Sequence, residues 1–174
     1  MSIALRHTLV SDLDFVIASE RADENSPFVV AWTREQHELA LANKDMGHWL
    51  IERQGERIGY IILAGLAQEH QSIELRRIVV TDKDKGYGRE ALRLIKKRVF
   101  GEWGAHRLWL DVKEHNARAR HLYESEGFIV EGVLRECVRN GREFESLVVL
   151  SILNDEYQTM GCQIISEESR NANE

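Results

Sequence analysis

Two glycines one residue apart, Gly86 and Gly88, stand between an apolar, β-branched run and a segment with helical spacing. A glycine-rich turn from a strand into a helix leaves backbone N–H groups bare at the positive end of the helix dipole, so it favours the binding of an anion such as a phosphate. The spacing differs from a dinucleotide-binding turn, because Ala91 occupies the third glycine position, and it lacks the Lys-Ser or Lys-Thr pair of a P-loop. The alternative is a tight turn without a ligand.

Asn116 and Tyr123 form a second candidate pair. They are seven residues apart in a segment with helical spacing, so on a helix they would share one face, about 10 Å apart along the axis. One elongated ligand could then contact both side chains. Alternatively, Asn116 begins the helix and Tyr123 is a partly buried core residue.

The elements that would position these residues follow from hydrophobic periodicity and from cap residues. Ser11 with Asp14, and Thr33 with Gln36, resemble capping boxes that begin two helices. Glycine-containing dipeptides at 54–55 and 140–141 predict two hairpin turns. The resulting order is strand, helix, helix, three strands, helix, strand, helix and two strands.

Composition limits the class of protein. The chain has 174 residues, of which 43% are apolar and 30% charged, and this suits one globular domain. Two cysteines are too few for a disulfide framework, and neither a leader-like segment nor an 18-residue apolar run is present, so we expect a cytoplasmic protein without a membrane partner. The net charge of −6 argues against general nucleic-acid binding. The seven histidines show no metal-binding spacing, so we expect no metal site.

The two motifs together resemble the GNAT superfamily of acetyl-CoA-dependent N-acetyltransferases. The chain reads K-x-x-G-Y-G from Lys83 to Gly88, and N-x-R-A-x-x-L-Y-x-x-x-G-F from Asn116 to Phe128. The segments HRLWLDV and GFIVEGVLRECVRNGREFESLVVLSIL look like the branch that contains the ribosomal-protein N-terminal (RimJ/RimL-like) acetyltransferases. The resemblance covers about residues 2–154. It implies an α/β, single-domain GNAT-like fold, with a mixed, largely antiparallel sheet of six to seven strands flanked by about four helices. We place this domain at residues 1–157 and a polar C-terminal tail at 158–174.

The resemblance implies acetyl-CoA as the co-substrate. Its pyrophosphate would lie over the glycine turn, and its pantetheine arm would pair with the backbone of the preceding strand. Lys83 stands where the family usually carries Gln or Arg, which keeps the positive charge but loses a planar donor. The residues expected to bind acetyl-CoA are Ile78, Val79, Val80, Lys83, Lys85, Gly86, Tyr87, Gly88, Arg89 and Asn116.

The implied reaction is direct attack of a primary amine on the thioester in a ternary complex. Tyr123 matches the family's tyrosine that protonates the departing thiolate. For the base that deprotonates the amine we expect Glu74, because it lies four residues before Ile78 on one strand and hence on the same face. The alternatives for the base are Glu69, His70 and Asp111.

The acceptor amine is left open. A protein N-terminus follows from the branch resemblance, whereas a polyamine or an aminoglycoside suits the acidic net charge, and an amino-acid-like metabolite is compatible with both. Phe28, Trp32 and Trp49 could line an acceptor pocket formed by the first helices and their loop, although such residues more often belong to the core. The last two strands could also pair in a homodimer. The alternative function is a non-catalytic acyl-CoA-binding sensor, which would need neither Tyr123 nor Glu74.

Overall fold

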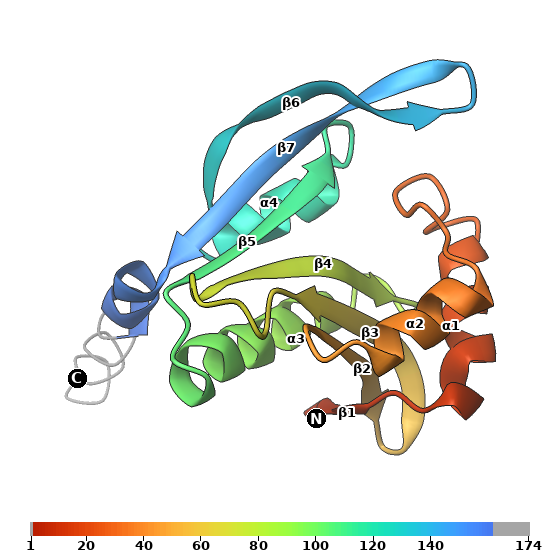
Figure 1. Ribbon diagram of the computed structural model, residues 1–174, viewed down its shortest axis with the longest axis horizontal. Helices are drawn as coiled ribbons and strands as arrows, with labels where there is room; N and C mark the ends of the chain where they lie inside the picture. Colours follow the sequence, from red (N-terminus) through yellow and green to blue (C-terminus); the bar gives the residue numbers. More distant parts are fainter. Residues whose placement is uncertain (1, 162–174) are drawn as a thin grey trace.

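A computed structural model describes residues 2–161 of the chain. It contains one seven-stranded sheet with the strand order β1-β2-β3-β4-β5-β7-β6 (Figure 1). The α/β fold class and the mixed, largely antiparallel sheet are therefore confirmed. The elements are β1 (Ala4–His7), η1 (Val10–Asp12), α1 (Leu13–Arg21), α2 (Arg34–Ala42), β2 (Met46–Arg53), β3 (Glu56–Ala64), β4 (Ser72–Val80), α3 (Tyr87–Lys96), η2 (Lys97–Glu102), β5 (Arg107–Lys113), α4 (Ala117–Ser125), β6 (Ile129–Asn140) and β7 (Glu143–Leu153), followed by a helix over residues 154–161.

The sheet opens between its two central strands. All neighbouring strands run antiparallel except β4 and β5, which are parallel. Their pairing is short, because only Ser72–Glu74 lies opposite Arg107–Trp109. Beyond these positions β4 and β5 diverge, as Figure 1 shows. The divergence leaves backbone groups of both strands available to a ligand.

The helices cover the two faces of the sheet over two separate cores. Neighbouring residues of β3 point to opposite faces, as the period of a strand requires. Ile61 belongs to the core under α3, together with Leu75. Ile62 belongs to the core under α1, together with Leu50. The N-terminal helices and α3 are therefore held on opposite sides of the same strands, β2, β3 and β4.

Local turn signals set the limits of several elements. Thr33 Oγ1 accepts a hydrogen bond from the Gln36 backbone N–H at 3.2 Å, and Gln36 Oε1 accepts one from the Thr33 backbone N–H at 2.8 Å, so the predicted capping box of α2 is confirmed. Both predicted hairpins are also confirmed. The strands β2 and β3 pair directly around residues 54–55, whereas β6 and β7 pair up to Asn140 and Glu143, so their turn is at residues 141–142, one position later than predicted.

The predicted capping box of Ser11 and Asp14 at the start of α1 is wrong. Asp12 organises this turn instead, because its carboxylate accepts a hydrogen bond from the Leu9 backbone N–H at 2.9 Å. The same carboxylate pairs with Arg6 of β1 at 2.7 Å. Asp12 thus caps the turn locally and also ties it to the preceding strand.

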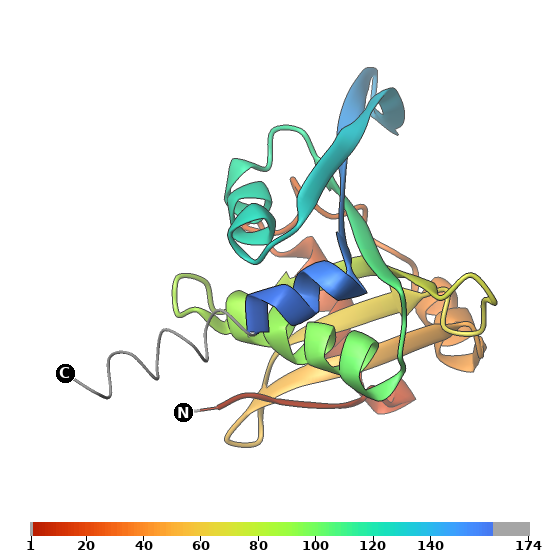
Figure 2. The same cartoon turned by 90° about the vertical axis from the view of Figure 1, so that its left-hand side faces the viewer.

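The last helix packs against η2, which continues α3 (Figure 2). The ring of Tyr157 stacks on Phe100 with the ring centroids 5.0 Å apart. The predicted polar tail starts at residue 158, inside this helix, and its part from residue 162 onward lies outside the described residues. Within residues 2–161, no helix combines the length and the apolar character needed to cross a membrane.

Candidate active site

A cleft of about 600 Å³ opens where β4 and β5 diverge. Its walls come from both strands, the start of α3, the inner side of α4 and the loop between α1 and α2, with Val138 and Leu147 of the β6–β7 hairpin at its edge. This volume is within the ~300–1,000 Å³ usual for ligand pockets. Of the residues predicted to bind acetyl-CoA or to act in catalysis, all but Lys85 and Glu74 line the cleft.

The glycine turn presents the N-terminus of α3 to this cleft. Gly86 is the N-cap of the helix and has a φ of 80°, a left-handed conformation that favours glycine. No side chain caps the helix, and its first intrahelical bond is donated by Glu90 to the Gly86 carbonyl. The N–H groups of Tyr87, Gly88 and Arg89 are therefore available to an anion at the positive end of the helix dipole. All three residues line the cleft, so the backbone fits a pyrophosphate.

The basic side chains of the turn are largely engaged elsewhere. Lys83 donates a hydrogen bond to the Glu24 carbonyl in the α1–α2 loop, and burial lowers the pKa of its ammonium. Lys85 is exposed and pairs with Asp82 at 2.7 Å, outside the cleft. Arg89 lines the cleft while Glu126 holds its guanidinium at 2.6 Å. Anion binding here accordingly depends more on backbone N–H groups than on side-chain charge.

Glu126, which follows α4, is a structural residue that sequence reasoning missed. It is buried and binds three cations of α3: Arg89, Arg93 at 2.9 Å and Lys96 at 3.0 Å. Burial raises the pKa of Glu126, but the hydrogen bonds from the three cations outweigh it, so the pKa lies below its ordinary value. The spacing of the cations along one helix face was the available signal. Their acidic partner ties the end of α4 to α3.

A β-bulge in β4 changes which of its side chains share a face. Ile78 lies opposite Ile61, but the register shifts so that Glu74 lies opposite Ala64, with Arg76 as the extra residue. Glu74 therefore shares the face of Arg77, and the expectation that Glu74 and Ile78 share a face is wrong. Ile78, Val79 and Val80 all line the cleft, and Glu74 does not.

Tyr123 and Asn116 both lie along the cleft, although α4 begins only at Ala117. Asn116 is its N-cap, and its Oδ1 accepts a hydrogen bond from the Ala119 backbone N–H at 3.2 Å. Burial raises the pKa of the Tyr123 hydroxyl, and the charge of Asp111 adds to this effect. Tyr123 therefore stays protonated at neutral pH and can donate a proton into the cleft.

Asp111, on β5, is the carboxylate whose surroundings best fit the role of a base. It lines the cleft, and it has no hydrogen-bond or ion-pair partner among the described residues. Its side chain is reached by solvent from the open side, yet the surrounding protein raises its pKa by desolvation, and the charge of Glu74 raises it further. Glu74 itself is bound to Arg76 at 2.6 Å. Glu69 and His70 lie in the β3–β4 loop, away from the cleft lining.

The side of the cleft formed by the α1–α2 loop, which we call the loop side, contains Phe28 and two cations. Arg77 is bound by Glu20, and Lys113 pairs with Glu145 at 2.7 Å. Both cations are thus neutralised by carboxylates of the protein.

Only one of the three aromatic residues expected in the acceptor pocket lines the cleft. Phe28 does so, with its ring 5.6 Å from that of His115. Trp32 packs beneath the guanidinium of Arg77, 4.6 Å from the ring centroid, in the core under α1. Trp49 points to the opposite face of the sheet and belongs to the core under α3.

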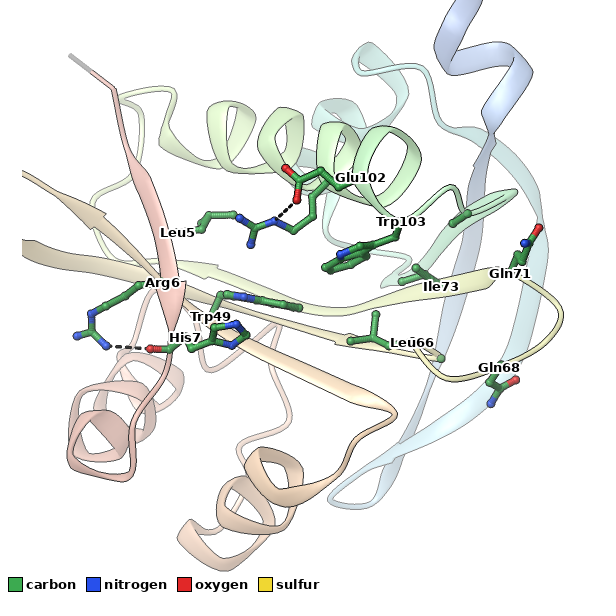
Figure 3. Close-up of a pocket in the computed structure, with 13 residues that line it drawn as sticks. Leu5, Arg6, His7, Trp49, Leu66, Gln68, Gln71, Ile73, Glu102 and Trp103 are labelled. Atoms are coloured by element: carbon green, nitrogen blue, oxygen red, sulfur yellow. Dashed lines mark hydrogen bonds and ion pairs between the residues drawn. The ribbon is translucent and has the colours of Figure 1, made fainter.

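A second cavity, of about 560 Å³, lies near the start of β4 and the end of α3 (Figure 3). Trp49 and Trp103 line it with their ring centroids 5.7 Å apart, and the ring centroid of His7 lies 5.4 Å from that of Trp49. Arg98 lies over the Trp49 ring and pairs with Glu102 at 3.4 Å, so these two charges neutralise each other. None of the residues predicted for catalysis or for acetyl-CoA binding lines this cavity.

Known proteins resemble the chain along most of its length. A family model described as "Acetyltransferase (GNAT) family" matches residues 17–128. The chain is 25% identical over 168 residues to the spermidine N(1)-acetyltransferase of Escherichia coli (strain K12), covering 90% of this chain and 88% of the relative. It is 30% identical over 108 residues to the spermidine N(1)-acetyltransferase of Vibrio cholerae serotype O1, covering 61% and 62% respectively.

A solved structure shares the whole fold. The crystal structure of spermidine N-acetyltransferase from Vibrio cholerae in complex with CoA and spermine has a TM-score of 0.81 and 22% identity, and the match covers 90% of this chain and 98% of that chain. The family match spans β4, the glycine turn and α4, which supply most of the cleft lining. The chain therefore belongs to the GNAT family and is an acetyl-CoA-dependent N-acetyltransferase.

Proposed function

We propose that the enzyme acetylates a small primary amine of the polyamine class. The two relatives named above are spermidine acetyltransferases, and one of them matches 90% of the chain. The observation that carries the proposal is the convergence, in one cleft, of a protonated Tyr123 hydroxyl, an unpaired Asp111 carboxylate and the uncapped N-terminus of α3. Acid, base and anion site are the three parts that acetyl transfer from a CoA thioester to an amine requires.

The glycine turn and β4 hold acetyl-CoA, which supplies an acetyl group activated as a thioester. Backbone N–H groups of the turn bind the pyrophosphate, assisted by Arg89 and Lys83 at the rim. The backbone of 78–80 is unpaired on the side of β5, so it can pair with the pantetheine arm as an added strand. The side chain of Asn116 lines the same wall and can donate to the arm.

Asp111 removes a proton from the ammonium of the acceptor. It suits this role better than Glu74, since it has no partner within residues 2–161 and its raised pKa makes it a stronger base than an ordinary carboxylate. Glu74 acts through its charge, which helps to keep the pKa of Asp111 high. Tyr123 donates its proton to the departing thiolate. The reaction is a direct transfer between two bound substrates.

The loop side of the cleft supports a cationic acceptor. Arg77 and Lys113 would repel a polyamine if they were free, but each is neutralised by a carboxylate, and Asp111 adds a negative charge. The chain as a whole also carries a net charge of −6, which attracts cations.

A protein N-terminus, the acceptor of the ribosomal-protein branch, is the second candidate. Val138 and Leu147 of the long β6–β7 hairpin line the edge of the cleft and offer an apolar surface to a peptide. A peptide would bring only one cationic group, so it would gain less from Asp111 and from the acidic net charge.

An amine panel tests the proposal. Purified enzyme with acetyl-CoA is given spermidine, spermine, a diamine, an aminoglycoside or short peptides with free N-termini, and the release of free CoA thiol is measured. We expect the highest kcat/KM with a polyamine, by ten-fold or more. A peptide that exceeds the polyamines would replace the first candidate by the second. Binding of acetyl-CoA without turnover of any amine would favour the non-catalytic sensor.

A further inference from the structure

A buried cluster of polar side chains, which we call the Glu20 cluster, lies beneath the α1–α2 loop. It consists of Glu20 of α1, His37 of α2, His48 of β2, Tyr60 of β3 and Arg77 of β4. The first, second and fourth of these are fully buried, and His48 is 3% exposed. The cluster therefore joins both N-terminal helices to three neighbouring strands.

Burial opposes the charge of Glu20, but the polar groups around its carboxylate outweigh this effect, so its pKa lies below the ordinary value. Its Oε1 accepts a hydrogen bond from the Tyr60 hydroxyl at 2.5 Å and another from the Arg77 guanidinium. His37 Nε2 lies 3.1 Å from the same oxygen, a close contact without the alignment of a hydrogen bond. Oε2 accepts a hydrogen bond from the Trp32 backbone N–H at 2.9 Å.

The cluster reaches the cleft through two links to the loop. The first is the bond from the Trp32 backbone to Glu20. The second is Arg77, which donates from Nη2 to the Val30 carbonyl at 2.8 Å and lies over the Trp32 ring. Val30 and Arg77 line the loop side of the cleft. The path of the loop at residues 30–32 is thus fixed by one buried carboxylate and the arginine it holds.

Burial of such a cluster is a weak source of stability. Replacement of a buried ion pair by well-packed apolar residues is often neutral or stabilising, because both charges lose their hydration. Polar groups also provide directional contacts, which apolar groups do not. The planar guanidinium of Arg77 binds Glu20 through Nη1 and the Val30 carbonyl through Nη2, and the Glu20 carboxylate binds the Trp32 backbone N–H.

We propose that Glu20 is a positioning residue for the acceptor amine. Through Trp32 and Arg77 it holds the loop side of the cleft at the distance from β4 that the acceptor needs, without touching the reacting atoms. This inference rests on the proposed function, in that the acceptor is taken to enter along the loop side.

The test compares two buried carboxylates. Glu20→Gln keeps the shape and the hydrogen-bond acceptor but removes the charge that holds Arg77. Asp12→Asn is the matched control, because Asp12 is 5% exposed, also binds an arginine and does not line the cleft. We expect Glu20→Gln to raise the KM of the acceptor by ten-fold or more with kcat and the Kd of acetyl-CoA within three-fold, and Asp12→Asn to leave all three within three-fold.

A second readout does not depend on turnover. Hydrogen exchange followed by mass spectrometry should show faster exchange of the peptide covering residues 22–33 in Glu20→Gln, and unchanged exchange there in Asp12→Asn. Arg77→Lys, which keeps the charge but loses the planar fork, should behave like Glu20→Gln and serves if the latter does not fold. Unchanged protection of residues 22–33, or equal losses for acceptor and acetyl-CoA, would overturn the positioning role. If the wild-type enzyme acetylates no amine, the proposed function fails, and the exchange experiment still decides whether Glu20 fixes the loop.

Discussion

At the scale of single residues, the two carboxylates considered for the base, Glu74 and Asp111, differ in what they are bound to. Glu74 is neutralised by Arg76, whereas Asp111 is unpaired among the described residues. Desolvation, followed by the charge of Glu74, raises the pKa of Asp111, and the charge of Arg76 opposes the rise. A base works only when it has lost its proton, so activity should fall as the pH drops through this raised pKa.

The two carboxylates can be separated by their pH profiles. Asp111→Asn should lower kcat/KM by about 10²–10⁴-fold, the usual contribution of a general base. Glu74→Gln should retain most activity but move the acidic limb of the profile to lower pH, because removal of a negative charge lowers the pKa of Asp111. The measurement is kcat/KM for the best amine between pH 5 and 9. Loss of activity in Glu74→Gln with retention in Asp111→Asn would assign the base to Glu74 instead.

Tyr123 is the candidate acid, and its hydroxyl can be removed without changing the packing. Tyr123→Phe keeps the ring, whose centroid lies 5.9 Å from that of Phe128, so the fold should be preserved. We expect kcat to fall by ten-fold or more, because the departing thiolate loses its proton donor, with the Kd of acetyl-CoA within two-fold. Calorimetry with acetyl-CoA and initial-rate kinetics give the two quantities. An unchanged kcat would remove Tyr123 from the mechanism.

At the scale of elements, the strand-turn-helix unit from β4 to α3 forms the wall of the cleft at which we propose that acetyl-CoA binds. Glycine is suited to its two positions in the turn for different physical reasons. At Gly86 the φ of 80° excludes most side chains, although the space around it is empty. At Gly88 an added Cβ would lie 3.6 Å from a Leu122 methyl group, an ordinary contact, so alanine fits there. The first glycine shapes the turn and the second leaves room beside it.

Substitutions at the two positions should therefore have different effects. Gly88→Ala should keep the Kd of acetyl-CoA within a few-fold, whereas Gly88→Leu should raise it by ten-fold or more, since the longer side chain occupies the cleft. Gly86→Ala should lower the free energy of unfolding by about 1 kcal/mol through backbone strain. Calorimetry and denaturant unfolding check these outcomes. A Gly88→Leu enzyme with wild-type affinity for acetyl-CoA would contradict the assignment of this wall.

The same unit shows how far sequence reasoning reaches. Element order, hairpins and the glycine turn follow from local periodicity and from turn residues, and the structure has them where they were expected. The side of the sheet to which Glu74 points was predicted wrongly. The extra residue Arg76 shifts the alternation of side chains between the two faces of β4, and no local signal in the sequence marks this bulge. The partner of Asp12 is likewise a residue of another element, Arg6. Side-chain engagement across elements, as of Lys83 with the Glu24 carbonyl, depends on tertiary contacts that spacing along the chain does not encode.

At the scale of the whole molecule, the Glu20 cluster links folding to pH. The pKa of His48 is lowered to about 4 by burial together with the charges of His37 and Arg77, while the charges of Glu20 and Asp12 oppose the shift. Between pH 6.5 and 4 the unfolded chain therefore binds a proton at His48 that the folded protein does not. Stability should fall with decreasing pH across this window.

Removal of His48 should flatten this dependence. One proton of difference corresponds to about 1.4 kcal/mol per pH unit. Wild-type enzyme should lose about this much unfolding free energy from pH 6 to 5, and His48→Gln should lose clearly less. Glu20 acts in a more acidic pH range. Although burial opposes it, the groups bound to its carboxylate lower its pKa to about 2, so the charged form stabilises the fold above pH 4.5 and this stabilisation is lost as the pH falls from about 4.5 to 2. Denaturant unfolding at several pH values measures both effects, and parallel profiles of wild type and variant would contradict the role of His48.

The short pairing of β4 with β5 has a consequence for solubility. A sheet ordinarily has two edges, but divergence beyond Glu74 and Trp109 gives this one two more, in its interior. Exposed edges are templates for pairing with other chains, and proteins usually protect them. We expect the enzyme without ligand to aggregate faster on mild heating than the enzyme saturated with CoA, measured by light scattering at equal concentration. The extent to which the enzyme is saturated with its co-substrate would then determine how long the protein stays in solution, as well as its rate of turnover.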